Sequence, residues 1–171
     1  MKKLAILFIA IFTVGLVSAQ SPIFEKGDHT FNIGTGVAYR GLPLEFSYTV
    51  GIVDDLLGAP GLTLGVGGYF GYSFWGPQFV LNNPDSYRGW STLVGVRAEL
   101  HYSIVDNLDF FGGPMVGFQH TYWENQVNTT NTPFVPGAYV GAKYFFAPNF
   151  GVYASAGYGI VFLSAGLTFQ F

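Results

Sequence analysis

The last twelve residues of the chain, 160–171, place the strongest constraint on its fold. Apolar side chains occupy alternate positions from Val161 to Phe171, and the positions between them from Ser164 to Gln170 are small or polar. An alternation with a period of two is typical of a β-strand that has one apolar face. A tilted strand needs about 9–11 residues to cross a bilayer, so this segment is long enough to span one.

The first nineteen residues have the composition of an export signal. Two lysines precede the apolar run 4–17, and small residues lie directly before Gln20. We therefore predict a signal peptide at 1–19 that is removed after export, which leaves a periplasmic lead at 20–28. A transmembrane helix is the alternative, but it needs about 20 apolar residues, more than this run provides.

Charge and cysteine content exclude several function classes. Without the two lysines of the signal peptide, five basic residues remain against ten acidic ones, so nucleic-acid binding is not expected. The chain has no cysteine, which excludes disulfides, thiolate metal sites and thiol catalysis. Its three histidines lie at unrelated spacings, so we expect no metal site and no cofactor.

Composition also indicates which face of the strands meets the solvent. Charged residues make up only 10% of the chain, against about 25% in soluble domains, and aromatic residues make up 19%. The face opposite the apolar one is rich in Gly, Ser and Thr, where a water-exposed face would carry Lys and Glu. We therefore expect an inside-out arrangement, with the apolar face on lipid and the small residues lining a narrow interior.

Eight segments of the chain show strand periodicity between turn-forming stretches. The sequence therefore predicts an all-β fold, an eight-stranded antiparallel up-and-down transmembrane β-barrel over 29–171. The predicted strands are 29–39, 43–52, 62–74, 90–104, 108–122, 134–146, 150–157 and 160–171.

The connections between these strands predict the orientation of the barrel. Asp106-Asn107 and Pro148-Asn149 suit tight hairpins, with Asn in the left-handed conformation. An even number of strands places these turns and both chain ends in the periplasm, and the longer loops 75–89 and 123–133 outside. Pro114 lies inside a predicted strand and predicts a β-bulge there.

Two stretches carry a resemblance to a known superfamily. The run from Ala138 to Gly159 and the ending Leu167, Phe169 and Phe171 resemble the closing hairpins and C-terminal signature of bacterial outer-membrane β-barrels. The signal peptide resembles those of the Bacteroidota. The resemblance implies a Gram-negative outer membrane, contact with its lipids, and insertion by the barrel-assembly machinery, for which these three residues would form the assembly signal.

Four charged residues fall on the predicted interior face: Glu45, Arg97, Glu99 and Lys143. Their charges sum to zero, and eight strands leave room only for side chains inside. We therefore predict an interior charge plug. Counting depth from the strand ends predicts the pairs Glu45 with Arg97 and Glu99 with Lys143, with Tyr69, Tyr139 and Tyr153 as hydrogen-bonding neighbours.

The function indicated is a structural, adhesive or envelope-organising role, with an extracellular partner that the sequence does not identify. A small channel for ions or apolar solutes is the alternative. His101 and Ser103 resemble the His-x-Ser pattern of outer-membrane lipid A deacylases, but Ile104 stands where that family has Asn. We therefore expect no enzymatic activity.

Overall fold

The computed structural model describes residues 23–76, 88–124 and 133–171. The predicted signal peptide and most of the two predicted external loops lie outside these ranges. Within them, no helix is long and apolar enough to cross a membrane.

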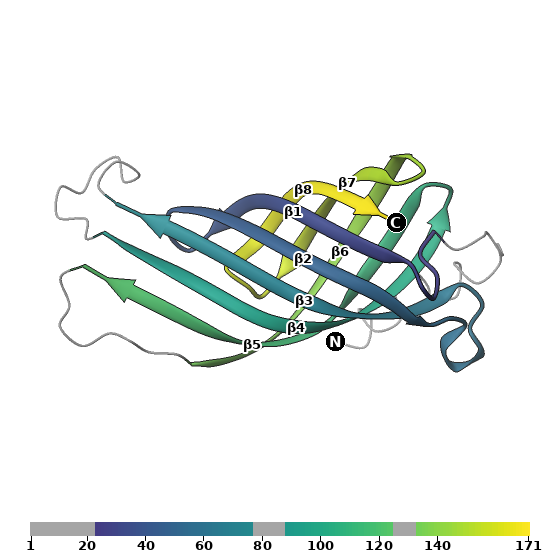
Figure 1. The fold of residues 1–171 in the computed structure, drawn as a ribbon, viewed down its shortest axis with the longest axis horizontal. Coiled ribbons are helices and arrows are strands. Elements are labelled where there is room, and N and C mark those ends of the chain that lie inside the picture. Colours follow the sequence, from purple (N-terminus) through teal and green to yellow (C-terminus); the bar gives the residue numbers. More distant parts are fainter. Residues whose placement is uncertain (1–22, 77–87, 125–132) are drawn as a thin grey trace, which may run out of the picture.

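Eight antiparallel strands close into a barrel in which each strand pairs with its neighbours in sequence and β8 pairs with β1 (Figure 1). The strands are β1 (His29–Ala38), β2 (Leu42–Val53), β3 (Leu62–Trp75), β4 (Gly89–Val105), β5 (Leu108–Trp123), β6 (Phe134–Ala147), β7 (Phe150–Gly157) and β8 (Val161–Gln170). This architecture confirms the predicted fold class, and the strands lie close to the predicted ranges.

The two ends of the barrel differ. His29 and Phe171 exchange two backbone hydrogen bonds of 2.9 and 3.0 Å at one end, which we call the termini end. The turns after β2, β4 and β6 also lie there. At the opposite end, which we call the loop end, β3, β4 and β5 project beyond the other strands (Figure 1). One wall of the barrel is therefore taller than the other at the loop end.

The outer face of the strands is apolar and exposed. Val94, Val96 and Val140 expose 58, 62 and 66% of their surface, and aromatic side chains such as Phe110 and Phe118 also point outward. A protein in water rarely leaves so much contiguous apolar surface uncovered. This surface is what a barrel presents to lipid.

Glycines allow the inner face to pack tightly. A Cβ at Gly67 would lie 1.8 Å from the carbonyl oxygen of Tyr48, and one at Gly166 would lie 2.0 Å from that of Ile33. Neighbouring strands approach too closely at these positions for any larger residue. The inward stripe of small residues is therefore a requirement of the tightly closed barrel.

Two expectations about strand regularity are wrong. Pro114 causes no bulge: the ladder between β5 and β6 runs through it without a register shift, and only the pairing with β4 is interrupted there. Val161 was expected to face lipid, yet it is buried inside the barrel. The register between β1 and β8 shifts beside Val161, and this irregularity reverses the direction of its side chain.

The termini-end turns agree only in part with the predicted conformations. Asn107 has a left-handed φ of 66°, as expected, but Asn149 is not among the residues with positive φ. The longer connection between β2 and β3 contains the 3₁₀ helix η2 (Leu56–Gly58). Asp54 in this connection accepts a hydrogen bond from the backbone N–H of Lys26. The connection between β2 and β3 therefore contacts the chain segment that precedes β1.

The exposed valines provide a test of which face meets lipid. Val96→Arg and Val140→Arg should each reduce the free energy of unfolding in lipid by about 2–4 kcal/mol, because a charge near the bilayer midplane is costly. Val105→Arg is the matched control: Val105 is also exposed, but it ends β4 near the termini end, where the cost should be about 0–1 kcal/mol. Equal losses in reversible unfolding for all three variants would contradict the inside-out assignment.

Candidate functional site

The interior of the barrel is filled by layers of side chains that follow one another along its axis. The layer nearest the termini end is formed by the segment 23–28, which folds back over the barrel opening. Phe24 is only 1% exposed, and its ring lies 4.0 Å from that of His101. The backbone N–H of Ile23 donates to Ser103 Oγ, and Gln170 Nε2 donates to the Ile23 carbonyl. Residues 23–28 of the predicted periplasmic lead thus fill the barrel opening, and we call them the N-terminal plug.

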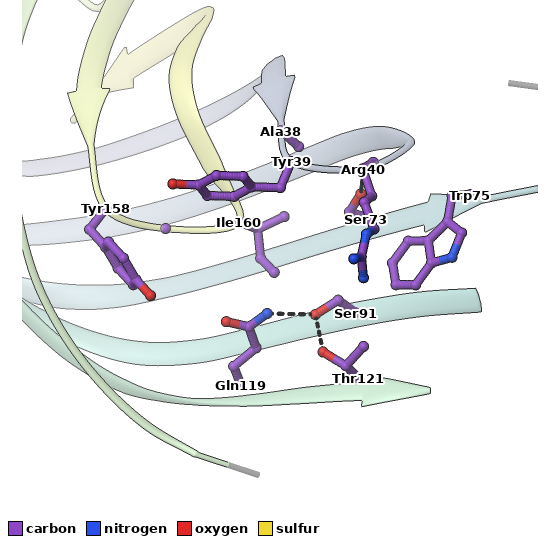
Figure 2. A pocket seen from close by; sticks show the side chains of 11 residues that line it. Ala38, Tyr39, Arg40, Ser73, Trp75, Ser91, Gln119, Thr121, Tyr158 and Ile160 are labelled. Atoms are coloured by element: carbon purple, nitrogen blue, oxygen red, sulfur yellow. Dashed lines mark hydrogen bonds between the residues drawn. The ribbon is translucent and has the colours of Figure 1, made fainter. Parts of the chain in front are cut away.

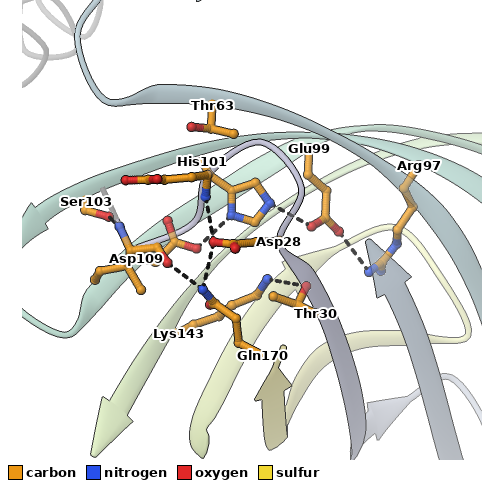
Figure 3. Close-up of polar contacts among 12 residues, drawn as sticks. Asp28, Thr30, Thr63, Arg97, Glu99, His101, Ser103, Asp109, Lys143 and Gln170 are labelled. Atoms are coloured by element: carbon orange, nitrogen blue, oxygen red, sulfur yellow. Dashed lines mark hydrogen bonds and ion pairs between the residues drawn. The ribbon is translucent and has the colours of Figure 1, made fainter. Parts of the chain in front are cut away.

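Beneath Phe24 lies a cluster of ionisable groups centred on His101 (Figure 3). Its Nδ1 lies 2.7 Å from Asp109 Oδ2, and its Nε2 lies 3.1 Å from Glu99 Oε2. These three side chains are at most 1% exposed. A neutral imidazole carries one N–H, so bonding to both carboxylates requires either an imidazolium or a protonated acid.

Arg97 forms the next layer. Its Nη1 lies 3.5 Å from Glu99 Oε1, and its guanidinium carbon lies 4.5 and 4.1 Å from the ring centroids of Tyr69 and Tyr139. A planar guanidinium between two aromatic faces gains cation–π attraction on both sides. Arg97 is thereby fixed across the lumen.

The tyrosine hydroxyls link the charged groups into one network. Tyr69 and Tyr153 donate to the two carboxylate oxygens of Glu45 at 3.1 and 2.7 Å, and Tyr139 donates to Glu99 at 2.9 Å. All three tyrosines were expected as hydrogen-bonding neighbours. Because both Glu45 oxygens are bound by neutral hydroxyls, its charge is stabilised without a direct cation.

The two predicted ion pairs are wrong. Among the described residues, Arg97 pairs with Glu99 and not with Glu45, to which it is connected only through Tyr69. Lys143 is fully buried, donates to Thr30 Oγ1 at 3.2 Å and lies over the rings of Phe111 and Phe24. The four predicted charges do lie inside the barrel, but they are joined differently.

Sequence reasoning missed the contribution of His101 and Asp109. Both lie on inward-facing strand positions. The alternation of side chains along the strands is the sequence signal that places them in the interior. The interior therefore contains six ionisable side chains: Glu45, Arg97, Glu99, His101, Asp109 and Lys143. The described residues contain no group of three or more acidic or histidine side chains arranged to hold a metal ion.

The inward orientation also bears on the deacylase resemblance. His101 and Ser103 are 1 and 9% exposed, and both lie inside the barrel beneath the N-terminal plug. A residue that acts on a lipid must reach the outer face. These two side chains do not.

A compact apolar layer closes the lumen above the charges. Leu93 and Met115 are at most 1% exposed, and they pack with Val135, Ile160 and Val161 in one buried cluster with the interior aromatic residues. Above this layer the barrel opens at the loop end into a cavity of about 370 Å³ (Figure 2). The cavity does not continue into the charged layers.

Comparison with known proteins identifies the fold. The structure of Ail, the attachment invasion locus protein of Yersinia pestis, in complex with the heparin analogue sucrose octasulfate matches 85% of this chain and 99% of its own, with a TM-score of 0.55 and 16% identity. The backbone structure of Ail in a phospholipid bilayer nanodisc gives the same TM-score and identity and is covered completely. A de novo designed transmembrane β-barrel gives a TM-score of 0.49.

No protein family model matches the chain, and no curated protein matches its sequence. The chain has the fold of bacterial outer-membrane β-barrels such as Ail.

The network predicts a specific pattern of energetic coupling. Arg97→Ala should cost about 3–5 kcal/mol of unfolding free energy, because it leaves Glu99 buried without this cation. Adding Glu99→Ala should recover part of that loss. The matched cycle of Arg97→Ala with Glu45→Ala should show weaker coupling, because only Tyr69 connects the two groups. Stronger coupling to Glu45 than to Glu99 in urea unfolding would contradict the observed pairing.

Proposed function

We propose that this protein is a non-enzymatic integral protein of the bacterial outer membrane, with a closed lumen and a structural, adhesive or envelope-organising role exercised at the loop end. Its termini would face the periplasm after removal of a Bacteroidota-type signal peptide. Insertion would depend on the barrel-assembly machinery and on Leu167, Phe169 and Phe171.

The filled lumen is the observation that carries this proposal. Six ionisable side chains, three tyrosines, an apolar layer and the Phe24 ring occupy the interior in sequence along the axis. The interior of an eight-stranded barrel is just wide enough for side chains to fill. A barrel whose lumen is filled in this way would pass few ions or solutes, so its role would depend on its outer surfaces.

The apolar outer face supports the membrane location. Exposed aliphatic and aromatic side chains occur on all eight strands, and the only route for so much apolar surface to avoid water is lipid. An aromatic group near the loop end, in which the Trp90 ring lies 5.9 Å from Tyr122 and 6.4 Å from Tyr72, suits the membrane interface.

The likeness to Ail is consistent with a surface role. Ail is named as an attachment protein and was solved with a heparin analogue. In this chain the strands β3, β4 and β5 project at one end of the barrel, while the other end is plugged. An adhesive or organising role fits this asymmetry better than transport does.

One experiment with two measurements tests the proposal. Wild-type protein refolded into planar bilayers should give no steady conductance. In cells, replacing residues 77–87 and 125–132 with short Gly-Ser linkers should leave the amount of heat-modifiable outer-membrane barrel unchanged but abolish its effect on surface binding or envelope integrity. Steady wild-type conductance would instead favour the channel alternative, and an unchanged phenotype after loop replacement would contradict a role at the loop end.

A further inference from the structure

The cavity at the loop end has the features of a small-molecule site. Its lining combines residues from the turn after β1, from β3, β4 and β5, and from the turn before β8 (Figure 2). On β4 and β5 the lining positions are Ser91, Gln119 and Thr121, which belong to the inward face. The strand side of the cavity is therefore the inner face of the wall formed by β3, β4 and β5, and a ligand would enter from the aqueous side and not from the lipid.

The described lining of this cavity carries a net positive charge. Among the described residues, Arg40 is the one charged residue that lines the cavity, and no carboxylate of those residues lies within 4.0 Å of its guanidinium. This differs from the interior below, where Arg97 is paired and where Glu45 and Glu99 are fully hydrogen-bonded. A lone cation in a concave site favours an anionic ligand.

Arg40 is also held in place without such a ligand. Its guanidinium carbon lies 4.3 Å from the ring centroid of Trp123 and 5.9 Å from that of Trp75. Its own carbonyl accepts a hydrogen bond of 2.5 Å from Ser73 Oγ. The next residue, Gly41, has a left-handed φ of 65°, and a Cβ there would lie 1.9 Å from the Phe74 carbonyl oxygen. The turn that carries Arg40 is thus fixed against β3, which reduces the entropy lost when a ligand binds.

The wall facing Arg40 is polar and pre-organised. Gln119 Nε2 donates to Ser91 Oγ at 3.0 Å, and Ser91 Oγ lies 3.0 Å from Thr121 Oγ1. Figure 2 shows the Arg40 side chain pointing toward this group, with the Gln119 amide and the Tyr158 ring bordering the same space. These hydroxyl and amide groups can both donate to and accept from the hydroxyls of a ligand.

The floor and the volume limit the size of that ligand. Ile160, 6% exposed, closes the cavity toward the apolar layer, so the site is a blind pocket. Its volume of about 370 Å³ is near the lower end of the range typical of small-molecule sites. One monosaccharide-sized molecule suits this space better than a polymer threading through it.

We propose that the loop-end cavity is a binding site for a soluble hydroxylated carboxylate of monosaccharide size, such as a sugar acid. Arg40 binds the carboxylate through its guanidinium, and the group of Ser91, Gln119 and Thr121 binds the hydroxyls. The site lies above the apolar layer, outside the charged layers and the N-terminal plug, and it would bind its ligand at the loop end.

The test uses the full-length refolded protein and its own fluorescence. Two of the three tryptophans, Trp75 and Trp123, flank Arg40, so ligand binding should change the emission. Glucuronate should give a saturable change, glucose should give none because it lacks the charge, and inorganic sulfate should bind more weakly because it lacks the ring hydroxyls.

Variants assign the signal to Arg40. Arg40→Gln should weaken glucuronate binding by about tenfold or more, because a charge-assisted hydrogen bond is lost. Arg88→Gln is the matched control: it removes one positive charge from the same end, but Arg88 is exposed, lies beside Glu124 and does not line the cavity. It should bind as the wild type does. Heat-modifiable mobility in electrophoresis checks that both variants fold.

Three results would overturn the proposal: no saturable response of the wild type to glucuronate, unchanged affinity in folded Arg40→Gln, or glucose or sulfate binding as tightly as glucuronate. The conductance and loop-replacement measurements are unaffected by any of them. Failure of this site is therefore distinguishable from failure of the proposed function.

Discussion

The pairing of β1 with β8 is the interaction on which the rest of the structure depends. The hydrocarbon core of a membrane offers no water to backbone N–H and C=O groups, so an unpaired strand edge there is too costly to persist. The ladder from Thr30 with Gln170 to Ala38 with Val161 removes both edges at once. Closure then requires close strand contacts, which explains the glycines, and creates a narrow interior that the inward side chains must fill.

The charged groups that fill that interior are bonded mainly to one another and to tyrosine hydroxyls, although Arg97 Nε and Asp109 Oδ1 have no hydrogen-bond partner among the described residues. A buried charge without a partner is strongly destabilising, although a complete network is not necessarily more stable than apolar packing. Here Glu45 is held by two tyrosine hydroxyls, and Glu99 is shared by Arg97, His101 and Tyr139. Through Asp109, which bonds to His101, the network also includes β5, so it joins the six strands β2 to β7 across the lumen. It therefore fixes the walls relative to one another as well as excluding water.

Most of the fold could be predicted from the sequence because alternation of side chains is a local property. The strands, their inward and outward faces and the interior location of Glu45, Arg97, Glu99 and Lys143 all follow from it. The partners of these charged residues do not follow from it. Because the strands are tilted, two residues at equal distances from their strand ends lie at different heights along the barrel axis. Through Gly71, Glu45 lies in register with Leu93 and not with Arg97.

Two further features depend on contacts that periodicity does not contain. Val161 turns inward because the register shifts beside it, and the N-terminal plug forms because Phe24 finds an aromatic and cationic surface provided by His101 and Lys143. The plug segment itself has no strand pattern. The loop-end cavity likewise combines residues from distant turns, so only the closed structure brings Arg40 next to Trp123.

The absence of cysteine from the chain allows a direct test of the closed lumen. Single cysteines can be introduced at Thr121, in the loop-end cavity, and at Ser47, which is buried on the inner face of β2 and bonded to Asn32. With folded protein in lipid vesicles, a membrane-impermeant maleimide should label Thr121→Cys readily and leave Ser47→Cys unmodified until the barrel is unfolded. Labelling of folded Ser47→Cys at a rate similar to that of Thr121→Cys would show a water-filled passage and contradict the account of a plugged barrel.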